Sequence, residues 1–201
     1  MCNVRRVLCV TNRLLCKEDF LGRIEKLAKA QPKGIILREK DLSASEYKAL
    51  AQAVLEICKK YNTPCILHSF ADIAIELGAA ALHLPLPLLR ELPQSKRRSF
   101  TVLGASCHGP EEAKEAEALG CTYITAGHVF DTDCKKGLPG RGIGFLKQVC
   151  ESVTLPVYAI GGISEENAAQ VIKAGARGVC VMSGAMTCAD PRKYLEKLRE
   201  I

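Results

Sequence analysis

The chain of 201 residues is 48% hydrophobic and 25% charged and carries a formal net charge of +6, a composition typical of a globular protein with one sizeable core. Its basic residues form no long run interleaved with aromatic residues, so we exclude nucleic acid as a partner. The eleven cysteines are odd in number and scattered, without a C-x-x-C pair, which argues against a zinc site or a disulfide framework. We recognise no signal peptide or membrane span, so we expect a cytoplasmic chain that does not bind membranes.

Short apolar, β-prone runs alternate with helical patterns along the whole chain. The eight predicted strands are residues 7–10, 34–37, 65–67, 81–84, 101–105, 123–126, 157–160 and 178–181. Predicted helices begin after Asp19, after Ser43 or Ser45, at residues 71, 111 and 144, at Ser164 with Asn167, and at Asp190 with Pro191. The segment 85–93 is apolar and punctuated by proline, and the leucines over 84–92 favour an apolar patch that pairs two subunits into a homo-oligomer.

The order of these elements predicts the fold. Strands that are apolar on both faces are typical of a parallel sheet covered by helices. Eight β/α units predict an α/β protein that is a single (β/α)8 TIM barrel, and residues 1–201 form one domain because no low-complexity linker divides them. The alternative is a doubly wound open sheet, but the glycine-rich phosphate fingerprint of that fold is absent after the first strand.

Polar residues follow most of the predicted strands, where the active site of such a barrel forms. Gly161 and Gly162 follow the seventh strand, and Ser183 and Gly184 follow the eighth. Their backbone N–H groups predict a phosphate site. Arg38 and Lys40, after the second strand, either bind a second anionic group or form a solvated charge cluster at a helix start.

The loop after the sixth strand, residues 121–144, carries the densest set of polar residues and glycines. Among the four histidines we favour His128, at the mouth of this loop, as the group that moves a proton near neutral pH. His83 lies inside an apolar strand and favours a structural role. His68 and His108 lie at strand ends and either bind substrate or hydrogen-bond a loop.

Six motifs in order resemble the thiamine phosphate synthase family over nearly the whole chain: I-L-R-E-K, H-L-P, G-A-S-C-H, G-H-V-F-D-T-D-C-K-K-G, A-I-G-G-I and V-M-S-G. The synthases typically have Q-L-R-x-K after strand two, N-D after strand three, H-x-G-Q-x-D after strand four and G-P-x-F-x-T-x-T-K after strand six. Here Ile36 replaces the glutamine, His68 and Ser69 replace the Asn-Asp pair, and residues 84–88 replace G-Q-x-D. In that family the missing aspartates hold Mg²⁺ against a pyrophosphate, so these departures argue against pyrophosphate displacement.

His128 also replaces the proline of G-P-x-F, and Cys134 replaces the second threonine, so the loop resembles the TenI branch of the family, the thiazole tautomerases. The resemblance implies an isomerase of thiamine biosynthesis, without metal or cofactor, that aromatises a carboxylated thiazole phosphate tautomer through His128 as general acid/base. The residues implied for substrate binding are Gly161, Gly162, Ser183 and Gly184 at the phosphate, Thr132, Cys134 and Lys135 over the ring, and Arg38, Lys40 or Ser106 at the carboxylate. The alternatives are a thiamine phosphate synthase, which couples a pyrimidine pyrophosphate to a thiazole phosphate, and a non-catalytic regulator of thiamine enzymes that keeps only the phosphate site.

Overall fold

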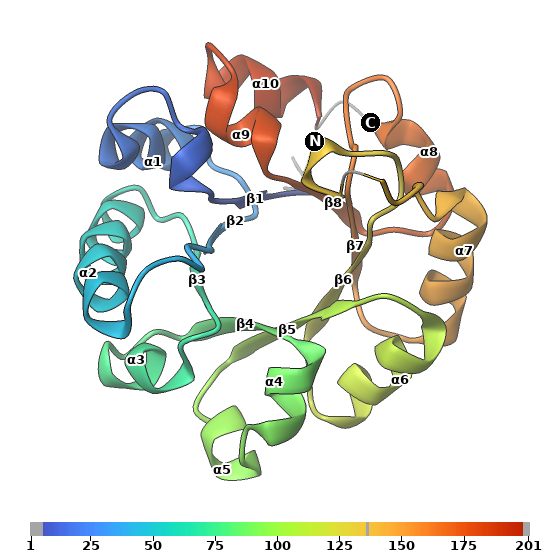
Figure 1. The fold of residues 1–201 in the computed structure, drawn as a ribbon, viewed down its shortest axis with the longest axis horizontal. Helices are drawn as coiled ribbons and strands as arrows, with labels where there is room; N and C mark the ends of the chain where they lie inside the picture. The colour runs from blue at the N-terminus through green and yellow to red at the C-terminus, as the bar shows by residue number, and fades with distance from the viewer. Residues whose placement is uncertain (1–5, 136, 199–201) are drawn as a thin grey trace. The chain divides into compact units, whose positions relative to one another are not determined.

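The computed structural model describes residues 6–135 and 137–198 of the chain. Eight strands, β1 to β8, form a closed barrel in which each strand neighbours the next along the chain (Figure 1). The predicted (β/α)8 TIM barrel is therefore confirmed, and the open doubly wound sheet is wrong. By their contacts the described residues form two compact units, one of 6–82 with 181–198 and the other of 83–180. That the whole chain is one domain stays a prediction.

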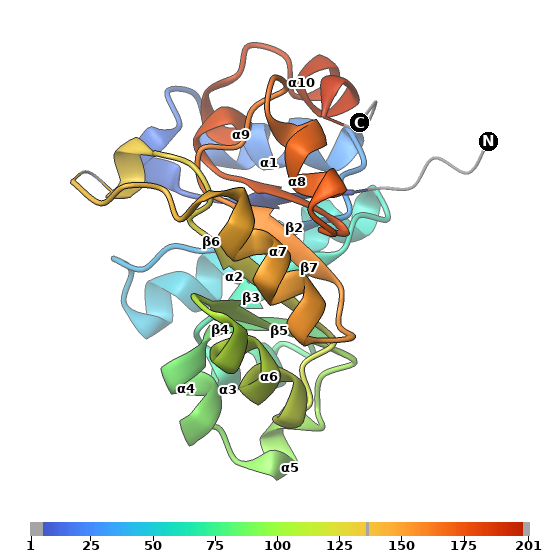
Figure 2. The same cartoon turned by 90° about the vertical axis from the view of Figure 1, so that its right-hand side faces the viewer.

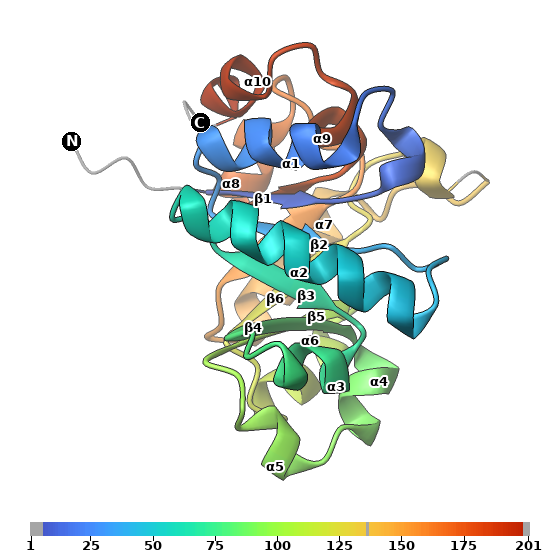
Figure 3. The same cartoon turned by 90° about the vertical axis from the view of Figure 1, so that its left-hand side faces the viewer.

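The first unit contains β1 (Val7–Val10), β2 (Gly34–Leu37) and β3 (Cys65–His68), which pair in parallel. A 3-10 turn, η1 (Arg13–Leu15), and the helices α1 (Phe20–Lys29), α2 (Ala44–Lys60) and α3 (Ala71–Glu76) connect or follow these strands. Helices α9 (Ser183–Thr187) and α10 (Pro191–Lys197) follow β8 and complete the unit. α1 and α2 lie side by side (Figure 3).

Two helix starts in this unit show why the chain becomes helical there. Asp19 Oδ2 accepts a hydrogen bond from the backbone N–H of Gly22 at 2.6 Å, which satisfies a donor that has no partner within α1. At α2 the cap is Ser43, one of the two predicted candidates, and it forms a reciprocal capping box with Glu46. Both helices thereby begin at a fixed residue.

The second unit contains β5 (Val102–Cys107), β6 (Tyr123–Gly127) and β7 (Val157–Ile160), with most of β4 (Ala81–Pro85) and β8 (Gly178–Val181). The pairing is parallel throughout β5 to β8, with Ser106 opposite Thr125 and Ile160 opposite Cys180. Its helices are α4 (Leu86–Glu91), α5 (Gln94–Arg97), α6 (Pro110–Ala118), α7 (Gly142–Ser152) and α8 (Ala168–Lys173), with a 3-10 turn, η2 (Asp133–Lys135). α6 and α7 lie side by side (Figure 2).

The segments 85–97 and 162–168 of this unit differ from the sequence prediction. The proline-punctuated segment forms α4 and α5, whose N-caps are Pro85 and Pro93, positions at which a missing N–H costs no helical hydrogen bond. α8 begins at Ala168, later than predicted. The Asn167 side chain accepts from the N–H of Ser164 at 2.9 Å and donates to the carbonyl of Gly162 at 2.8 Å, which holds 162–167 as a turn.

Strands β5 and β6 have one apolar face and one face that carries polar side chains. Leu103, Ala105 and Cys107 are buried on one face of β5, and Cys107 Sγ donates to the carbonyl of Glu112 in α6, so this face packs against a helix. Because side chains alternate along a strand, Ser106 lies on the opposite, interior face, together with Thr125 of β6. Among residues 6–135 and 137–198, no helix combines the length and the apolar composition that a bilayer span requires.

Candidate active site

His128 directly follows β6 and is half-buried. Its Nε2 lies 3.2 Å from the carbonyl oxygen of Leu138, which is 10 residues further along the same loop. A carbonyl oxygen can only accept a hydrogen bond, so Nε2 carries the hydrogen and the lone pair of the neutral ring is on Nδ1. The Gly127–His128 peptide bond is cis. The surroundings of His128 therefore select one tautomer, in which Nδ1 is the basic nitrogen.

Backbone hydrogen bonds hold the loop on both sides of His128. The N–H of Val129 donates to the carbonyl of Ile160 at 2.9 Å, and the N–H of Arg141 donates to the carbonyl of His128 at 3.0 Å. Arg141 also donates from Nη1 to the carbonyl of His108 at 2.6 Å, which ties the end of this loop to the segment after β5. The position of the imidazole is thus fixed through the backbone as well as through its ring.

Gly161 and Gly162 let this loop approach the end of β7. Their φ angles are +101° and +64°, in the left-handed region that side chains disfavour. A Cβ on Gly161 would overlap the Cβ of His128, and a Cβ on Gly162 would lie 2.7 Å from the Cβ of Phe130. The two glycines are needed for the approach of the His128 loop. Their contact with a phosphate stays a prediction.

The outer part of the loop turns the chain back towards His128. The N–H of Lys135 donates to the carbonyl of Thr132 at 2.9 Å, and the N–H of Leu138 donates to the carbonyl of Lys135 at 3.0 Å. These two turns position the Leu138 carbonyl that accepts from His128. Lys135 is exposed and Thr132 is half-buried, whereas the side chain of Cys134 lies outside the described part of the chain. Contacts of these three residues with substrate stay predictions.

Ser106 belongs to a buried chain of polar groups on the interior face. Its Oγ lies 2.9 Å from Nε2 of His83 and accepts from Thr125 Oγ1 at 3.4 Å, while Nδ1 of His83 lies 2.9 Å from the Tyr123 hydroxyl. Burial lowers the pKa of His83 to about 3, so this ring is neutral at physiological pH. Sequence reasoning placed His83 in a strand but missed its link to Ser106. His83 and Ser106 are 23 residues apart in the sequence, and no local pattern shows that their side chains meet.

The other strand-end histidine of this unit, His108, contacts the start of the next helix. Its backbone N–H donates to Glu112 Oε2 at 2.7 Å, and its Nδ1 lies 3.2 Å from the same oxygen. The side chain is exposed, and Glu112 belongs to the first turn of α6. The structure therefore places the His108 side chain against the start of α6, whereas the expected partner was a loop or the substrate. A role of His108 in substrate binding stays a prediction.

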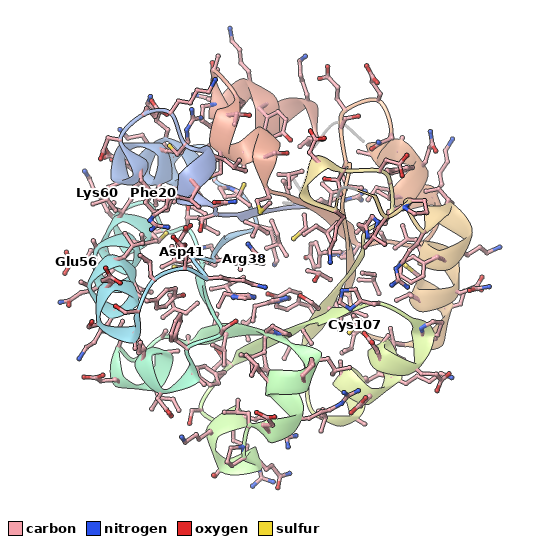
Figure 4. All side chains as sticks on the ribbon, viewed as in Figure 1. Phe20, Arg38, Asp41, Glu56, Lys60 and Cys107 are labelled. Carbon is pink, nitrogen blue, oxygen red and sulfur yellow. The ribbon has the colours of Figure 1, made fainter. Side chains whose placement is uncertain are left out.

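In the first unit, Arg38 and Lys40 lie on the segment after β2, where Figure 4 labels Arg38. The N–H of Arg38 donates to Thr11 Oγ1 at 2.9 Å, and the Thr11 hydroxyl donates to Glu39 Oε1 at 2.6 Å. Arg38 is half-buried and Lys40 is exposed. Their backbone is held through Thr11 and Glu39, and their contact with an anion stays a prediction.

Glu39 is a buried carboxylate of this segment that sequence reasoning missed. It is only 2% exposed, and both carboxylate oxygens accept from the N–H of Arg13, at 3.1 and 3.0 Å. Arg13 in turn donates to Asp41 at 2.7 Å, and this hydrogen bond lowers the pKa of Asp41. The carboxylate joins the segments after β1 and β2. Nothing in the local pattern separates this buried glutamate from its exposed charged neighbours.

His68 is also buried, and Ser69 Oγ lies 2.7 Å from its Nδ1. The N–H of His68 donates to the hydroxyl of Tyr47, which donates to the carbonyl of Leu37. This position, which holds Asn-Asp in the synthase pattern, therefore offers an imidazole and a hydroxyl. Within the described residues, no group of three or more His, Cys, Asp or Glu side chains is arranged to hold a metal ion.

Ser183 and Gly184 begin the short helix α9. Ser183 is exposed, and its carbonyl accepts from Thr187 Oγ1 at 2.9 Å. A Cβ on Gly184 would overlap the hydroxyl of Tyr194 in α10, so close packing of that helix requires glycine here. Binding of a phosphate by these two residues stays a prediction.

Comparison with known proteins places the chain in a family. The model of the family described as thiamine monophosphate synthase matches residues 7–185. Thiamine-phosphate synthase 2 of Streptococcus pneumoniae is 34% identical, with 98% of this chain and 96% of that protein covered, and thiamine-phosphate synthase of Clostridium acetobutylicum is 35% identical, with 96% and 92% covered.

Among solved structures, thiamine phosphate pyrophosphorylase from Pyrococcus furiosus superposes with a TM-score of 0.83 at 30% identity, with 98% of this chain and 95% of that chain covered. A 3-hexulose-6-phosphate synthase shares the fold, with a TM-score of 0.72 at 18% identity, covering 97% and 98% of the two chains. From the match over residues 7–185 and from relatives that align over nearly their full length, the chain belongs to the thiamine monophosphate synthase family.

Proposed function

We propose that the protein is a thiazole tautomerase of thiamine biosynthesis, an isomerase that aromatises a carboxylated thiazole phosphate by moving a proton. The observation that carries the proposal is the environment of His128, whose Nε2–H donates to the Leu138 carbonyl and leaves Nδ1 as a base at the end of β6. Histidine is the side chain whose ordinary pKa lies near neutral pH. The synthase pattern has proline at this position, which cannot carry a proton.

One histidine balances the reaction. Nδ1 takes the proton from the ring carbon, and the electron pair of that C–H bond enters the aromatic ring. The electron pair of the exocyclic double bond forms a new C–H bond at the exocyclic carbon, with the proton that the imidazolium returns. No oxidant, reductant or co-reactant enters this balance. While the ring is charged, Nε2–H keeps its bond to the Leu138 carbonyl, which stabilises the imidazolium.

We assign the substrate phosphate to the backbone N–H groups of Gly161 and Gly162 and to Ser183 and Gly184. In barrels of this class a phosphate commonly binds at the loops after strands seven and eight, and β7 and β8 pair up to Ile160 and Cys180. The remaining assignments from the sequence are Thr132, Cys134 and Lys135 over the ring, and Arg38, Lys40 or Ser106 at the carboxylate.

Thiamine-phosphate synthase is the second candidate, and the names of the relatives favour it. In that family aspartates hold Mg²⁺ against the pyrophosphate, and Mg²⁺ binds through carboxylates and water. The residues at the corresponding strand ends do not fit this ion. His68 and Ser69 supply no carboxylate, and after His83 the chain continues with leucine and proline. We therefore place the synthase second.

Two assays on the purified protein decide between the candidates: aromatisation of the carboxylated thiazole phosphate tautomer, and formation of thiamine phosphate from the pyrimidine pyrophosphate and thiazole phosphate with Mg²⁺. We expect activity in the first. His128→Ala should lower kcat by about 10²- to 10⁴-fold, the usual contribution of a general acid/base. The matched control His108→Ala removes an exposed histidine that contacts Glu112 and should leave kcat nearly unchanged.

Each outcome separates the candidates. Full activity of His128→Ala would rule out His128 as the proton carrier. Thiamine phosphate formation without tautomerase activity would establish the synthase in place of our proposal. Tight binding of the thiazole phosphate without turnover in either assay would favour the non-catalytic regulator.

A further inference from the structure

The interior face of β5 and β6 carries a chain of polar contacts that the proposed proton shift does not use. It runs from the Tyr123 hydroxyl to Nδ1 of His83, at 2.9 Å, and from Nε2 of His83 to Ser106 Oγ, at 2.9 Å. Thr125 Oγ1 donates to the same serine oxygen at 3.4 Å. Tyr123, His83 and Thr125 are 6%, 3% and 3% exposed, whereas Ser106 is half-buried. The chain thus leads from a buried phenol to a serine nearer the surface.

The order of donors along this chain follows from the chemistry of its members. Burial raises the pKa of Tyr123 and lowers that of His83, so the phenol is protonated and the imidazole is neutral. A phenol is a better donor than an imidazole N–H, and an imidazole nitrogen is a better acceptor than a phenol oxygen. Tyr123 O–H therefore donates to Nδ1, and the hydrogen of the neutral ring is on Nε2, which donates to Ser106 Oγ.

This order determines what Ser106 can do. Its oxygen has two lone pairs, and they accept from His83 Nε2 and Thr125 Oγ1. The hydroxyl hydrogen of Ser106 is then available to a third group. If the hydrogen of His83 were on Nδ1, the Ser106 hydroxyl would donate to Nε2 and could only accept a hydrogen bond from a ligand. Which ring nitrogen of His83 carries the hydrogen therefore decides whether Ser106 can donate a hydrogen bond to a ligand or can only accept one.

The strand register places Ser106 just below the strand ends. Ser106 lies opposite Thr125, and Thr125 precedes Gly127 by two residues on the same face of β6. His128 directly follows β6, and β6 pairs with β5, so the serine and the base come from the ends of two neighbouring strands within the same compact unit. The phosphate is already assigned to the segments after β7 and β8. The acceptor that remains for a donor on β5 is the substrate carboxylate.

We propose that Ser106 donates a hydrogen bond to the carboxylate of the bound thiazole, and that His83 and Tyr123 are positioning residues that set the direction of its hydroxyl. The carboxylate assignment rests on the proposed function, whereas the order of hydrogen bonds does not. No bond is formed or broken in this arrangement.

The first experiment measures the tautomer of His83 in the ligand-free wild type. Long-range ¹H–¹⁵N correlation spectra of protein labelled in histidine, assigned by comparison with His83→Gln, distinguish a protonated from an unprotonated ring nitrogen. We expect hydrogen on Nε2 and none on Nδ1. Hydrogen on Nδ1 would overturn the donor order. In Tyr123→Phe the ring loses the phenol that donates to Nδ1, so hydrogen should appear on Nδ1 in a measurable fraction of molecules.

The second experiment measures the binding of two ligands by calorimetry: the carboxylated thiazole phosphate product and the same molecule without its carboxylate. Ser106→Ala should weaken the carboxylated ligand by about ten- to hundredfold, as expected for a hydrogen bond to a charged group, and leave the other unchanged. Tyr123→Phe should weaken the carboxylated ligand in the same sense. Its matched control is Tyr158→Phe, which removes the hydroxyl of a buried tyrosine that packs edge-on against Tyr123 but takes no part in the hydrogen bonds from Tyr123 to Ser106. This variant should change neither affinity.

Three results would overturn the proposal. If Ser106→Ala weakened the binding of both ligands equally, the assignment of the carboxylate to Ser106 would be wrong. If Tyr123→Phe and Tyr158→Phe had equal effects on affinity, Tyr123 would not be a positioning residue. Binding of neither ligand by the wild type would overturn the carboxylate assignment together with the proposed function. In that case the tautomer of His83 would still decide the order of hydrogen bonds.

Discussion

The approach of the His128 loop to Gly162 can be tested by adding a single methyl group. In Gly162→Ala the new Cβ would lie 2.7 Å from the Cβ of Phe130 and 3.0 Å from its carbonyl carbon, and would overlap the carbonyl oxygen of Asp131. The chain also offers a matched control. Gly78 has the same φ of +64°, but nothing lies within 4 Å of the position of its Cβ. Gly78→Ala therefore imposes the backbone strain without the overlap.

The expected magnitudes follow from these two terms. Holding a residue other than glycine in the left-handed region costs about 1–2 kcal/mol, and this is the whole expected cost of Gly78→Ala. Overpacking a site that has no room for a methyl group costs a further ~1–3 kcal/mol. Gly162→Ala should therefore lower the free energy of unfolding by about 2–5 kcal/mol. The difference between the variants isolates the packing against Phe130 and Asp131.

Urea unfolding followed by far-ultraviolet circular dichroism measures both variants, since the chain has no tryptophan for fluorescence. Slopes equal to that of the wild type would show that the changes are in stability alone. Gly162→Ala should also lower turnover more than its stability loss explains, because the shift of Phe130 moves the neighbouring His128. A cost no greater than that of Gly78→Ala would refute the argument that close approach of the loop requires glycine at 162.

Three further predictions concern stability. Glu39→Gln should lower the free energy of unfolding in urea by about 1–3 kcal/mol, because the amide N–H₂ would face the donors of Thr11 and Arg13 that the carboxylate accepts from. A loss smaller than that of Thr11→Val would contradict this role of Glu39 as an acceptor. Because burial lowers the pKa of His83 to about 3 from the ordinary 6.5, the unfolded chain binds a proton that the folded chain does not, so the free energy of unfolding should fall as pH decreases from about 6.5 to 3, by up to ~1.4 kcal/mol per pH unit. His83→Gln should remove this slope, and an unchanged slope would refute the assignment. Gly184→Ala should cost about 1–3 kcal/mol through overlap with Tyr194, and Tyr194→Leu in the same chain should recover part of the loss, whereas strictly additive costs would disprove the contact.

The strands could be predicted from the sequence because each is a short apolar run between polar or turn-forming residues. The predictions for β1, β2, β7 and β8 coincide with the structure. β5 extends two residues further than predicted, to Cys107, because Ser106 and Cys107 pair with Thr125 and Ala126 of β6. A polar side chain on an interior face is invisible to hydropathy, since only the pairing of the neighbouring strand shows that the residue is in the sheet.

The geometry of the candidate site could be anticipated where it depends on position along the chain, and less so where it depends on the path of the loop. His128 was a candidate because it follows a strand of a barrel. Its partner, the carbonyl of Leu138, is a backbone atom that every residue carries, so no side-chain pattern identifies it. Gly161 and Gly162 were associated with phosphate binding, whereas their packing against the His128 loop depends on a tertiary contact.

The bond between His128 and a backbone carbonyl has a consequence for how this loop diverges among relatives. Any residue that leaves the backbone in place at position 138 supplies the same carbonyl oxygen. Substitutions at this position should therefore accumulate without selection against them. The separation of 10 residues between His128 and position 138 should be retained, because inserting or deleting one residue would bring a different carbonyl, or none, to Nε2. The length of this loop, rather than the identity of its residues, is the heritable feature that preserves the basic nitrogen.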